Sequence, residues 1–175
     1  GAAEAAGLAA YDEGSQRGEL RYVIVRSNAD EEVLVGIVVT STASRDRVTR
    51  LGEALSRHPS VRGVLAIDND RRDGGIVPAG SRQRVVSGSA TIGERLAGVE
   101  LQVGIGEFLQ VNRAAAAGLH QHVAAIASAS EGLRVTELFA GLGGISLILA
   151  RAGAVVHAVE IDREAVASLT AACVA

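Results

Sequence analysis

The stretch from residue 133 to residue 173 constrains the fold more than any other part of this chain. Two strand-like apolar runs, 133–139 and 154–160, are separated by a glycine cluster and by an apolar helical segment, 145–152. The order strand, glycine turn, helix, strand is typical of a parallel, doubly wound sheet, because a parallel neighbour requires a crossover connection. Asp162 can cap a last helix. The spacing of the apolar residues in that helix predicts these inward positions: Ala165, Val166, Leu169, Ala172 and Cys173.

The upstream pattern predicts a different kind of unit. Runs 22–25 and 33–40 flank a turn-prone loop and indicate a hairpin, and Ser44 or Asp46 can cap a helix that Pro59 ends. Further strands are expected at 61–67, at 84–86 and at 99–103. We therefore expect an α/β protein with two domains: a small antiparallel α+β domain, 1–105, and a truncated Rossmann-like domain, 106–175. A helix over 112–130 should present Leu119, Val123 and Ile126 on one face.

Composition narrows the classes of function. A hydrophobic fraction of 48% with 21% charged residues suffices for a packed core. One cysteine and four histidines exclude a disulfide framework and a cysteine-rich metal site. No apolar run approaches the roughly 18 residues of a membrane span, and no signal peptide is evident. The default expectation is a soluble, cytoplasmic protein without a metal.

The glycine turn is the strongest candidate site. Gly141, Gly143 and Gly144 would let the backbone pass close to a ligand, and Glu160 at the tip of the next strand could accept hydrogen bonds from ribose hydroxyls. A dinucleotide fingerprint would require a third glycine where Ser146 stands. Phe139 suits an adenine face or a methionine-like tail, which favours S-adenosylmethionine over NAD. The alternative is a plain tight turn with a solvated Glu160.

A second motif precedes this turn. Phe108, Gln110 and Asn112 lead into a helix and then into the turn at 137–144. This order resembles the RNA (uracil-5-)-methyltransferase family, the 5-methyluridine methyltransferases of 23S rRNA and tRNA. In that family a Phe-x-Gln-x-Asn segment precedes an Asp-Leu-Phe-Cys-Gly-x-Gly turn. Segments 8–13, 18–21, 63–69 and 98–101 also look like the family's central domain.

The resemblance implies S-adenosylmethionine as cofactor and rRNA or tRNA as partner. It places Gln110, Phe139, Gly144 and Glu160 at cofactor contacts, and it implies that an Asp on a later strand completes the pocket. This chain departs from the family at Glu137 (usually Asp), Ala140 (usually Cys) and Ala172 (usually Asn). Segments 139–144 and 160–162 also look like DNA cytosine-5 methyltransferases, which carry the motif near their start with nothing like 108–112 before it.

The chemistry of uracil methylation requires a thiolate that adds to C6 and a base that removes the C5 proton. Cys173 is the single thiol, lies on the expected apolar face and has no neighbour that would activate it. The family resemblance places the nucleophile and the base downstream. We therefore predict no catalytic residue here and no methylation by the chain as given.

The alternative function is a non-catalytic, nucleotide-binding or oligomerising module. Without its neighbour, the strand at 135–139 would have an unpaired edge, which predicts self-association or pairing with another chain.

Two weaker signals remain. The segment from residue 45 to residue 84 contains nine arginines and five acidic residues, whereas the whole chain has a net charge of −3. This surplus fits either RNA phosphates or an ordinary solvated face. His120 and His122, two positions apart on a helix, point in different directions, which argues against a metal pair.

Overall fold

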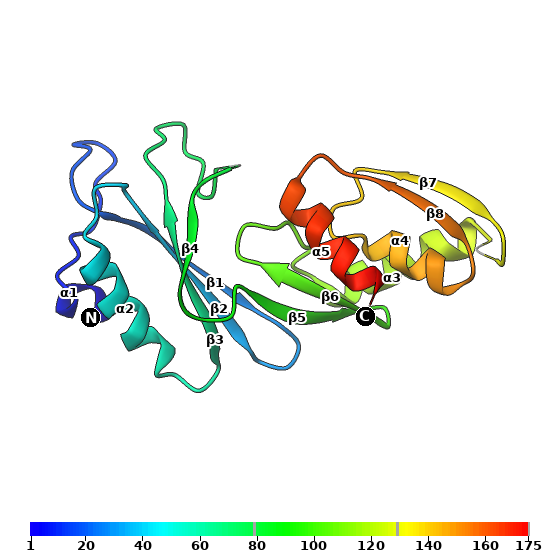
Figure 1. The fold of residues 1–175 in the computed structure, drawn as a ribbon, viewed down its shortest axis with the longest axis horizontal. Helices are drawn as coiled ribbons and strands as arrows, with labels where there is room; N and C mark the ends of the chain where they lie inside the picture. The colour runs from blue at the N-terminus through cyan, green and yellow to red at the C-terminus, as the bar shows by residue number, and fades with distance from the viewer. Residues whose placement is uncertain (79, 129, 175) are drawn as a thin grey trace. The chain divides into compact units, whose positions relative to one another are not determined.

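The computed structural model describes residues 1–78, 80–128 and 130–174. Contacts divide it into two compact units, Gly1–Ile92 with Gly104–Gly106, and Gly93–Val103 with Glu107–Ala175. The elements appear in Figure 1 in this order: α1 (Ala2–Ala5), β1 (Leu20–Ser27), β2 (Val33–Val39), α2 (Arg45–Ser56), β3 (Val61–Asp68), β4 (Gln83–Gly88), β5 (Thr91–Leu96), β6 (Val99–Gly104), α3 (Arg113–Ile126), β7 (Arg134–Leu138), α4 (Gly144–Arg151), β8 (Val155–Val159) and α5 (Arg163–Cys173).

The first unit contains a four-stranded sheet in the order β1-β2-β3-β4. The β1–β2 pair is antiparallel, which confirms the predicted hairpin. The β2–β3 pair is parallel, whereas the sequence predicted an antiparallel sheet. The reason is that α2 connects the two strands and carries the chain back to the starting edge, so that β3 runs in the same direction as β2. β4 then pairs antiparallel with β3 and completes a mixed sheet.

Both faces of this sheet are covered. On one face Val35, Ile37 and Val39 pack with Val48 and Leu51 of α2, and Figure 1 shows α1 and α2 on this side. On the other face the alternate residues pack in a second cluster: Leu34, Val38, Leu65, Ile67, Ile92 and Ile105. Strands buried on both faces have continuous apolar sequences rather than alternating ones. This explains why β2 and β3 are the most apolar runs of the first unit.

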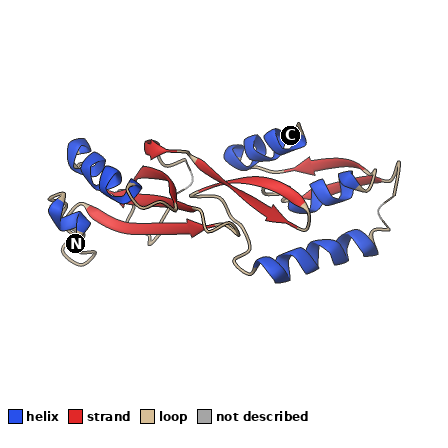
Figure 2. Ribbon diagram, turned by 90° about the horizontal axis from the view of Figure 1, so that it is seen from below, coloured by secondary structure: helices blue, strands red, loops and turns tan. Residues whose placement is uncertain are grey.

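The second unit contains two separate pairs of strands, β5–β6 and the parallel pair β7–β8. α3, α4 and α5 lie on one side of β7–β8 in Figure 1, and Figure 2 shows α4 between α3 and α5. The strand-helix-strand-helix order predicted for 133–173 is confirmed. The core consists of Leu96, Val99, Leu101, Val103, Ala116, Leu142 and Ala165.

The division by contacts does not coincide with the domain boundary predicted at 105/106. Residues 93–103 belong to the second unit, because Leu101 and Val103 pack against Leu142 and Ala165. Ile92 and Ile105, on either side of this hairpin, remain in the core of the first unit. A sequence pattern identifies the strands of a hairpin but not which core they join.

Several positions predicted to be inward are exposed. Cys173 is exposed, and Val166 is 41% exposed. On α3, Leu119 and Ile126 are 52% and 71% exposed, and Ala116 is the residue of that helix that is buried. Helical periodicity identifies the apolar face correctly, but it does not show whether this chain supplies a partner for it. Within the described ranges no helix is long and apolar enough to cross a membrane, and no cluster of three metal-ligating side chains occurs.

Candidate functional site: the glycine turn after β7

The turn that follows β7 adopts an unusual backbone. Phe139, Gly141 and Gly143 have φ values of +59°, +55° and +78°. Gly143 is the N-cap of α4, and the Ala140 N–H donates to the Val159 carbonyl at 3.0 Å. Positive φ is costly for a residue with a side chain, by about 1–2 kcal/mol. Phe139 therefore has a strained backbone, and residues with strained backbones are often found at functional sites.

The three glycines of the turn have different reasons to be glycine. A Cβ on Gly143 would lie 2.1 Å from Leu169 Cδ1, and one on Gly144 would lie 2.6 Å from His120 Cε1. A Cβ on Gly141 would meet nothing within 4 Å. Gly143 and Gly144 are thus crowded by side chains of α5 and α3, which would have to shift for a larger residue, whereas Gly141 faces open space into which a ligand can approach.

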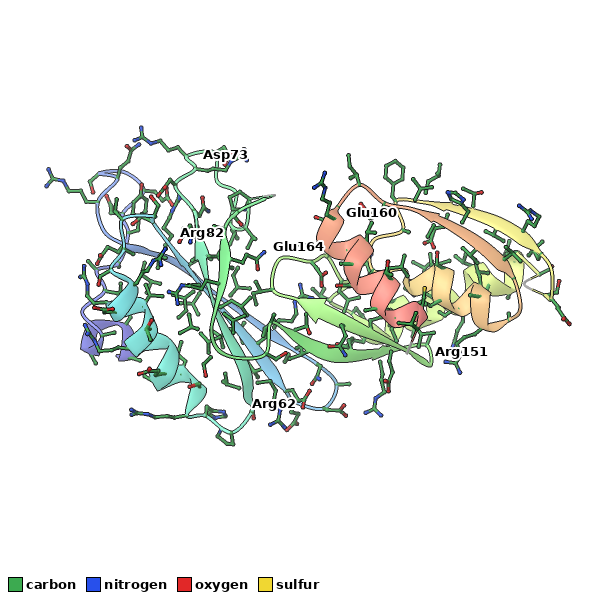
Figure 3. All side chains as sticks on the ribbon, viewed as in Figure 1. Arg62, Asp73, Arg82, Arg151, Glu160 and Glu164 are labelled. Atoms are coloured by element: carbon green, nitrogen blue, oxygen red, sulfur yellow. The ribbon has the colours of Figure 1, made fainter. Side chains whose placement is uncertain are left out.

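Glu160 connects the tip of β8 to this turn, as Figure 3 shows where β8 leads into α5. Its Oε2 accepts a hydrogen bond from the Gly141 N–H at 2.7 Å. Its Oε1 accepts from the N–H groups of Ile161, at 2.7 Å, and Asp162, at 2.9 Å. These backbone donors, of Asp162 first and then of Gly141 and Ile161, lower the pKa of Glu160. The carboxylate is therefore held ionised against the glycine turn.

A cavity opens beside the turn. Among the residues predicted for the site, Gln110, Phe139, Gly141 and Gly144 line it. Gly143 and Glu160 are not among its lining residues: Gly143 starts α4, and Glu160 reaches the site through Gly141. The remaining lining residues come from the β5–β6 hairpin, the 108–109 segment, α3, β7, the turn itself and α4: Leu96, Leu101, Phe108, Leu109, His120, Glu137, Ala140, Leu142 and Ile145.

The segment that carries Gln110 is fastened at two points. The Asn112 side chain caps α3 and accepts from the Ala115 N–H at 3.0 Å. The buried Glu107 accepts from the Ser168 hydroxyl of α5 at 2.7 Å. Because both ends are anchored, the exposed Gln110 between them is held at the cavity wall. The polar residues of this motif thus have structural roles beside the one that lines the cavity.

Sequence reasoning missed two contributors to the cavity. The Ser146 hydroxyl donates to the Glu137 carboxylate, so the residue that replaces a third glycine orients an acid of the cavity wall. His120 lies against Gly144, and its Nδ1 is buried without a hydrogen-bond partner in the described part of the chain. Burial lowers the pKa of His120, and the Glu137 charge opposes this. The spacing of His120 and His122 in the sequence argues only against a metal pair, and it is the packing of α3 on the turn that brings His120 here.

The chemical capacity of the site follows from these groups. An anionic carboxylate at a strand tip can accept hydroxyl donors, and the exposed rings of Phe139 and Phe108 offer apolar faces. Gln110 adds an amide with donors and an acceptor. This combination suits a ligand with a ribose and a planar or aliphatic apolar part.

Comparisons with known proteins bear on this arrangement. No family model matches the chain. It is 28% identical over 163 residues to a protein of Oceanobacillus iheyensis named an uncharacterized RNA methyltransferase, covering 91% of this chain and 35% of that protein. It is 30% identical over 157 residues to a protein of the same description from Streptococcus agalactiae, covering 89% and 34%. The chain thus spans about a third of the length of these relatives.

Two solved structures are similar in fold. The tRNA (uracil-54, C5)-methyltransferase of Pyrococcus abyssi, in complex with S-adenosyl-L-homocysteine, superposes with a TM-score of 0.76 at 20% identity, covering 97% of this chain and 40% of that one. Trm5 of Methanocaldococcus jannaschii, in complex with adenosine, gives 0.50 at 18% identity, over 87% and 44%. The first likeness confirms the α/β, Rossmann-like fold.

Proposed function

We propose that this chain is the central domain and the first half of the cofactor domain of an S-adenosylmethionine-dependent RNA methyltransferase that acts on C5 of uracil. Relatives named RNA methyltransferases match nine-tenths of the chain, although the chain spans about a third of each. A structure of similar fold is a tRNA (uracil-54, C5)-methyltransferase in complex with S-adenosyl-L-homocysteine. These likenesses support the reaction class, and the residues of the turn support the cofactor.

The observation that carries the proposal is the hydrogen bond between the Glu160 carboxylate and the Gly141 N–H, 2.7 Å long. It places an acid of lowered pKa beside the open glycine of the turn. A carboxylate offers about four lone-pair sites, and Oε2 uses one of its two. We assign the free one to a ribose hydroxyl of the cofactor, a role that an acid at the tip of the second strand performs in nucleotide-binding sheets.

The rest of the cofactor would extend along the cavity wall. We assign Gln110 and Phe139 to its adenine or methionine part, because the ring offers an apolar face and the amide a polar partner at the same wall. When bound, S-adenosylmethionine supplies the methyl group. The nucleophile and the base would come from the part of the longer relatives that this chain does not match. Cys173, exposed at the end of α5, is not assigned a role.

Isothermal titration calorimetry with S-adenosyl-L-homocysteine tests the proposal on the chain of 175 residues. We expect measurable but weak binding, because we propose that the pocket of the longer relatives is completed by parts that this chain does not match. Glu160→Gln should weaken it about tenfold, or ~1.4 kcal/mol, since an amide group presents a donor where the Gly141 N–H and a ribose hydroxyl need acceptors. Glu131→Gln, an exposed acid of the same unit, is the control for charge.

Three results would contradict the assignment. Stronger binding of NAD than of S-adenosyl-L-homocysteine would exclude this cofactor. Nanomolar binding would exclude an incomplete pocket. An equal effect of Glu160→Gln and Glu131→Gln would remove Glu160 from the site, provided circular dichroism shows both variants folded.

A second candidate function, association with a second copy of the chain, is favoured by one observation. β7 and β8 form a sheet of two strands, and Leu138, Val155 and Val159 are 63%, 55% and 42% exposed on it. An uncovered sheet with apolar side chains is prone to pairing. Sedimentation velocity over a concentration series should show dimers that Leu138→Lys abolishes. A monomer at every concentration would exclude this function.

A further inference from the structure

The first unit contains a polar cavity far in sequence from the glycine turn. It lies where β2 and β3 end and α2 begins, and its polar lining residues are Ser41, Arg45, Asp68, Arg82 and Arg84. Three arginines and one aspartate give this lining a net charge of +2 by formal count. In Figure 3 Arg82 appears at the entrance to β4.

These three arginines differ from four others of the unit that pair with an acid. Arg21, Arg47, Arg62 and Arg71 each form an ion pair, with Glu13, Glu19, Glu32 and Asp73 respectively. No ion pair is recorded for Arg45, Arg82 or Arg84 in the part of the chain that the structure describes. Asp70, a further acid nearby, accepts from the Ser41 N–H at 2.9 Å. The cavity lining therefore keeps a formal surplus of positive charge.

The fold brings the three side chains together by two independent routes. Arg84 stands opposite Ala66 in the β3–β4 register. Ala66 and Val86 both pack in the α2 cluster, and Arg82, which precedes β4, lies two positions before Arg84 and lines the same cavity. Arg45 enters from the first turn of α2. The face that packs against the helix thus continues past the helix start as a basic surface.

Stability does not explain this placement. A cation in the first turn of a helix opposes the helix dipole, and three like charges around one cavity repel one another. Positions that break local rules without an evident compensating contact are candidates for binding. A ligand with negative charge would supply the missing counter-charge.

We propose that Arg45, Arg82 and Arg84 form a phosphate-binding site that holds the sugar-phosphate backbone of single-stranded RNA. Guanidinium groups match phosphate oxygens with paired N–H donors, and the Ser41 hydroxyl adds a neutral donor. The inference rests on the proposed function only for its choice of RNA as the source of the phosphate. It gives the first unit a role in holding substrate while the second unit holds cofactor.

Fluorescence anisotropy with a short labelled oligouridylate tests the site without any cofactor, so a failure of the proposed cofactor site leaves this test readable. Arg82→Ala and Arg84→Ala should each weaken binding about three- to tenfold at moderate salt. Each should also reduce the slope of log affinity against log salt by about 0.7, the share of one phosphate contact on a single strand. Arg82→Lys should retain the slope, because the charge remains.

The matched control is Arg57→Ala, which removes an exposed arginine at the opposite end of α2. It should leave both affinity and slope nearly unchanged, and thermal melts should show all variants folded. Equal effects of Arg57→Ala and Arg82→Ala, or no RNA binding by the unchanged chain, would overturn the proposal. Displacement of the RNA by inorganic phosphate at low millimolar concentration would also overturn it, because the site would then serve free phosphate.

Discussion

The two units each contain a parallel strand-helix-strand motif, β2-α2-β3 in the first and β7-α4-β8 in the second. In the first, nearly every residue of the strands is buried, and neighbouring strands flank the pair on both edges. In the second, exposed and half-buried residues alternate, and the pair has no further strand among the described residues. The same strand-helix-strand connection thus occurs once as a closed pair, flanked by further strands and buried, and once as an open pair, without flanking strands and partly exposed.

The difference teaches where this chain can place a ligand. In the open pair the strand tips, the glycine turn and Glu160 remain accessible, and the cavity beside them is lined by helix, hairpin and turn. In the closed pair the arginine cavity lies beside α2, where β2 and β3 end. A well-packed unit can tolerate unpaired charges at its edge, because its stability comes from two apolar clusters elsewhere.

The largest expected effect contrasts the two pairs directly. Ile37→Ala in β2 should destabilise the first unit by about 2–5 kcal/mol, since Ile37 is fully buried and its removal leaves a cavity. Val155→Ala in β8 should cost no more than about 0.5 kcal/mol, because that side chain is 55% exposed. Urea denaturation of both variants measures the difference. Equal losses would mean that the open face of β7–β8 is covered in solution.

A second contrast lies within the turn. Gly143→Ala should cost about 2–4 kcal/mol, because φ is +78° and the new Cβ would lie 2.1 Å from Leu169 Cδ1. Gly141→Ala should cost about 1 kcal/mol, the strain of its positive φ alone, since nothing lies within 4 Å. Thermal melts rank the two. If Gly141→Ala melts lower than Gly143→Ala, the space beside Gly141 is not open.

The sequence predicted most elements of the two strand-helix-strand motifs. It did not predict that one motif is buried and flanked by further strands and that the other is partly exposed. The helices, the hairpin and the strand-turn-helix-strand order follow from local patterns: continuous apolar runs, glycine positions and helical spacing. The direction of β3 depended on recognising that α2 is a crossover, and the sequence analysis treated the sheet as antiparallel. The exposure of Leu119, Ile126 and Cys173 could not be predicted, because periodicity identifies a face and not its partner.

The site, too, was predicted only in part, because local patterns identify motifs but not which elements pack together. Gln110, Phe139, Gly141 and Gly144 meet at one cavity, as motif order indicated, and their role in cofactor binding stays a prediction. His120 arrives from a helix about two dozen residues before the turn, and its contact with Gly144 depends on the crossing of α3 and α4. Such a contact is a property of helix packing, which single-residue patterns do not encode.

Helix capping offers a third, smaller contrast. Asn112→Ala should destabilise the second unit by about 1 kcal/mol, because its side chain accepts from the Ala115 N–H. Ser44 occupies the same position on α2 in the first unit but makes no side-chain cap bond, so Ser44→Ala should be nearly neutral. Chemical denaturation of both variants checks this. A loss at Ser44 equal to that at Asn112 would show that Ser44 does cap α2 in solution.

The smallest expected effect is a dependence of stability on pH that arises from His120 in the second unit. Burial lowers the pKa of His120 below its ordinary value of about 6.5, so the folded second unit favours the neutral ring. Between the lowered pKa and about 6.5 the unfolded chain binds more protons than the folded one, so stability falls as pH decreases through this window and levels off below it. His120→Gln should remove that slope. His58→Gln, in the first unit, is the control, and denaturation midpoints at several pH values provide the measurement. An unchanged slope in His120→Gln would mean that the ring is solvated, and Gly144 would then have no need to accommodate it.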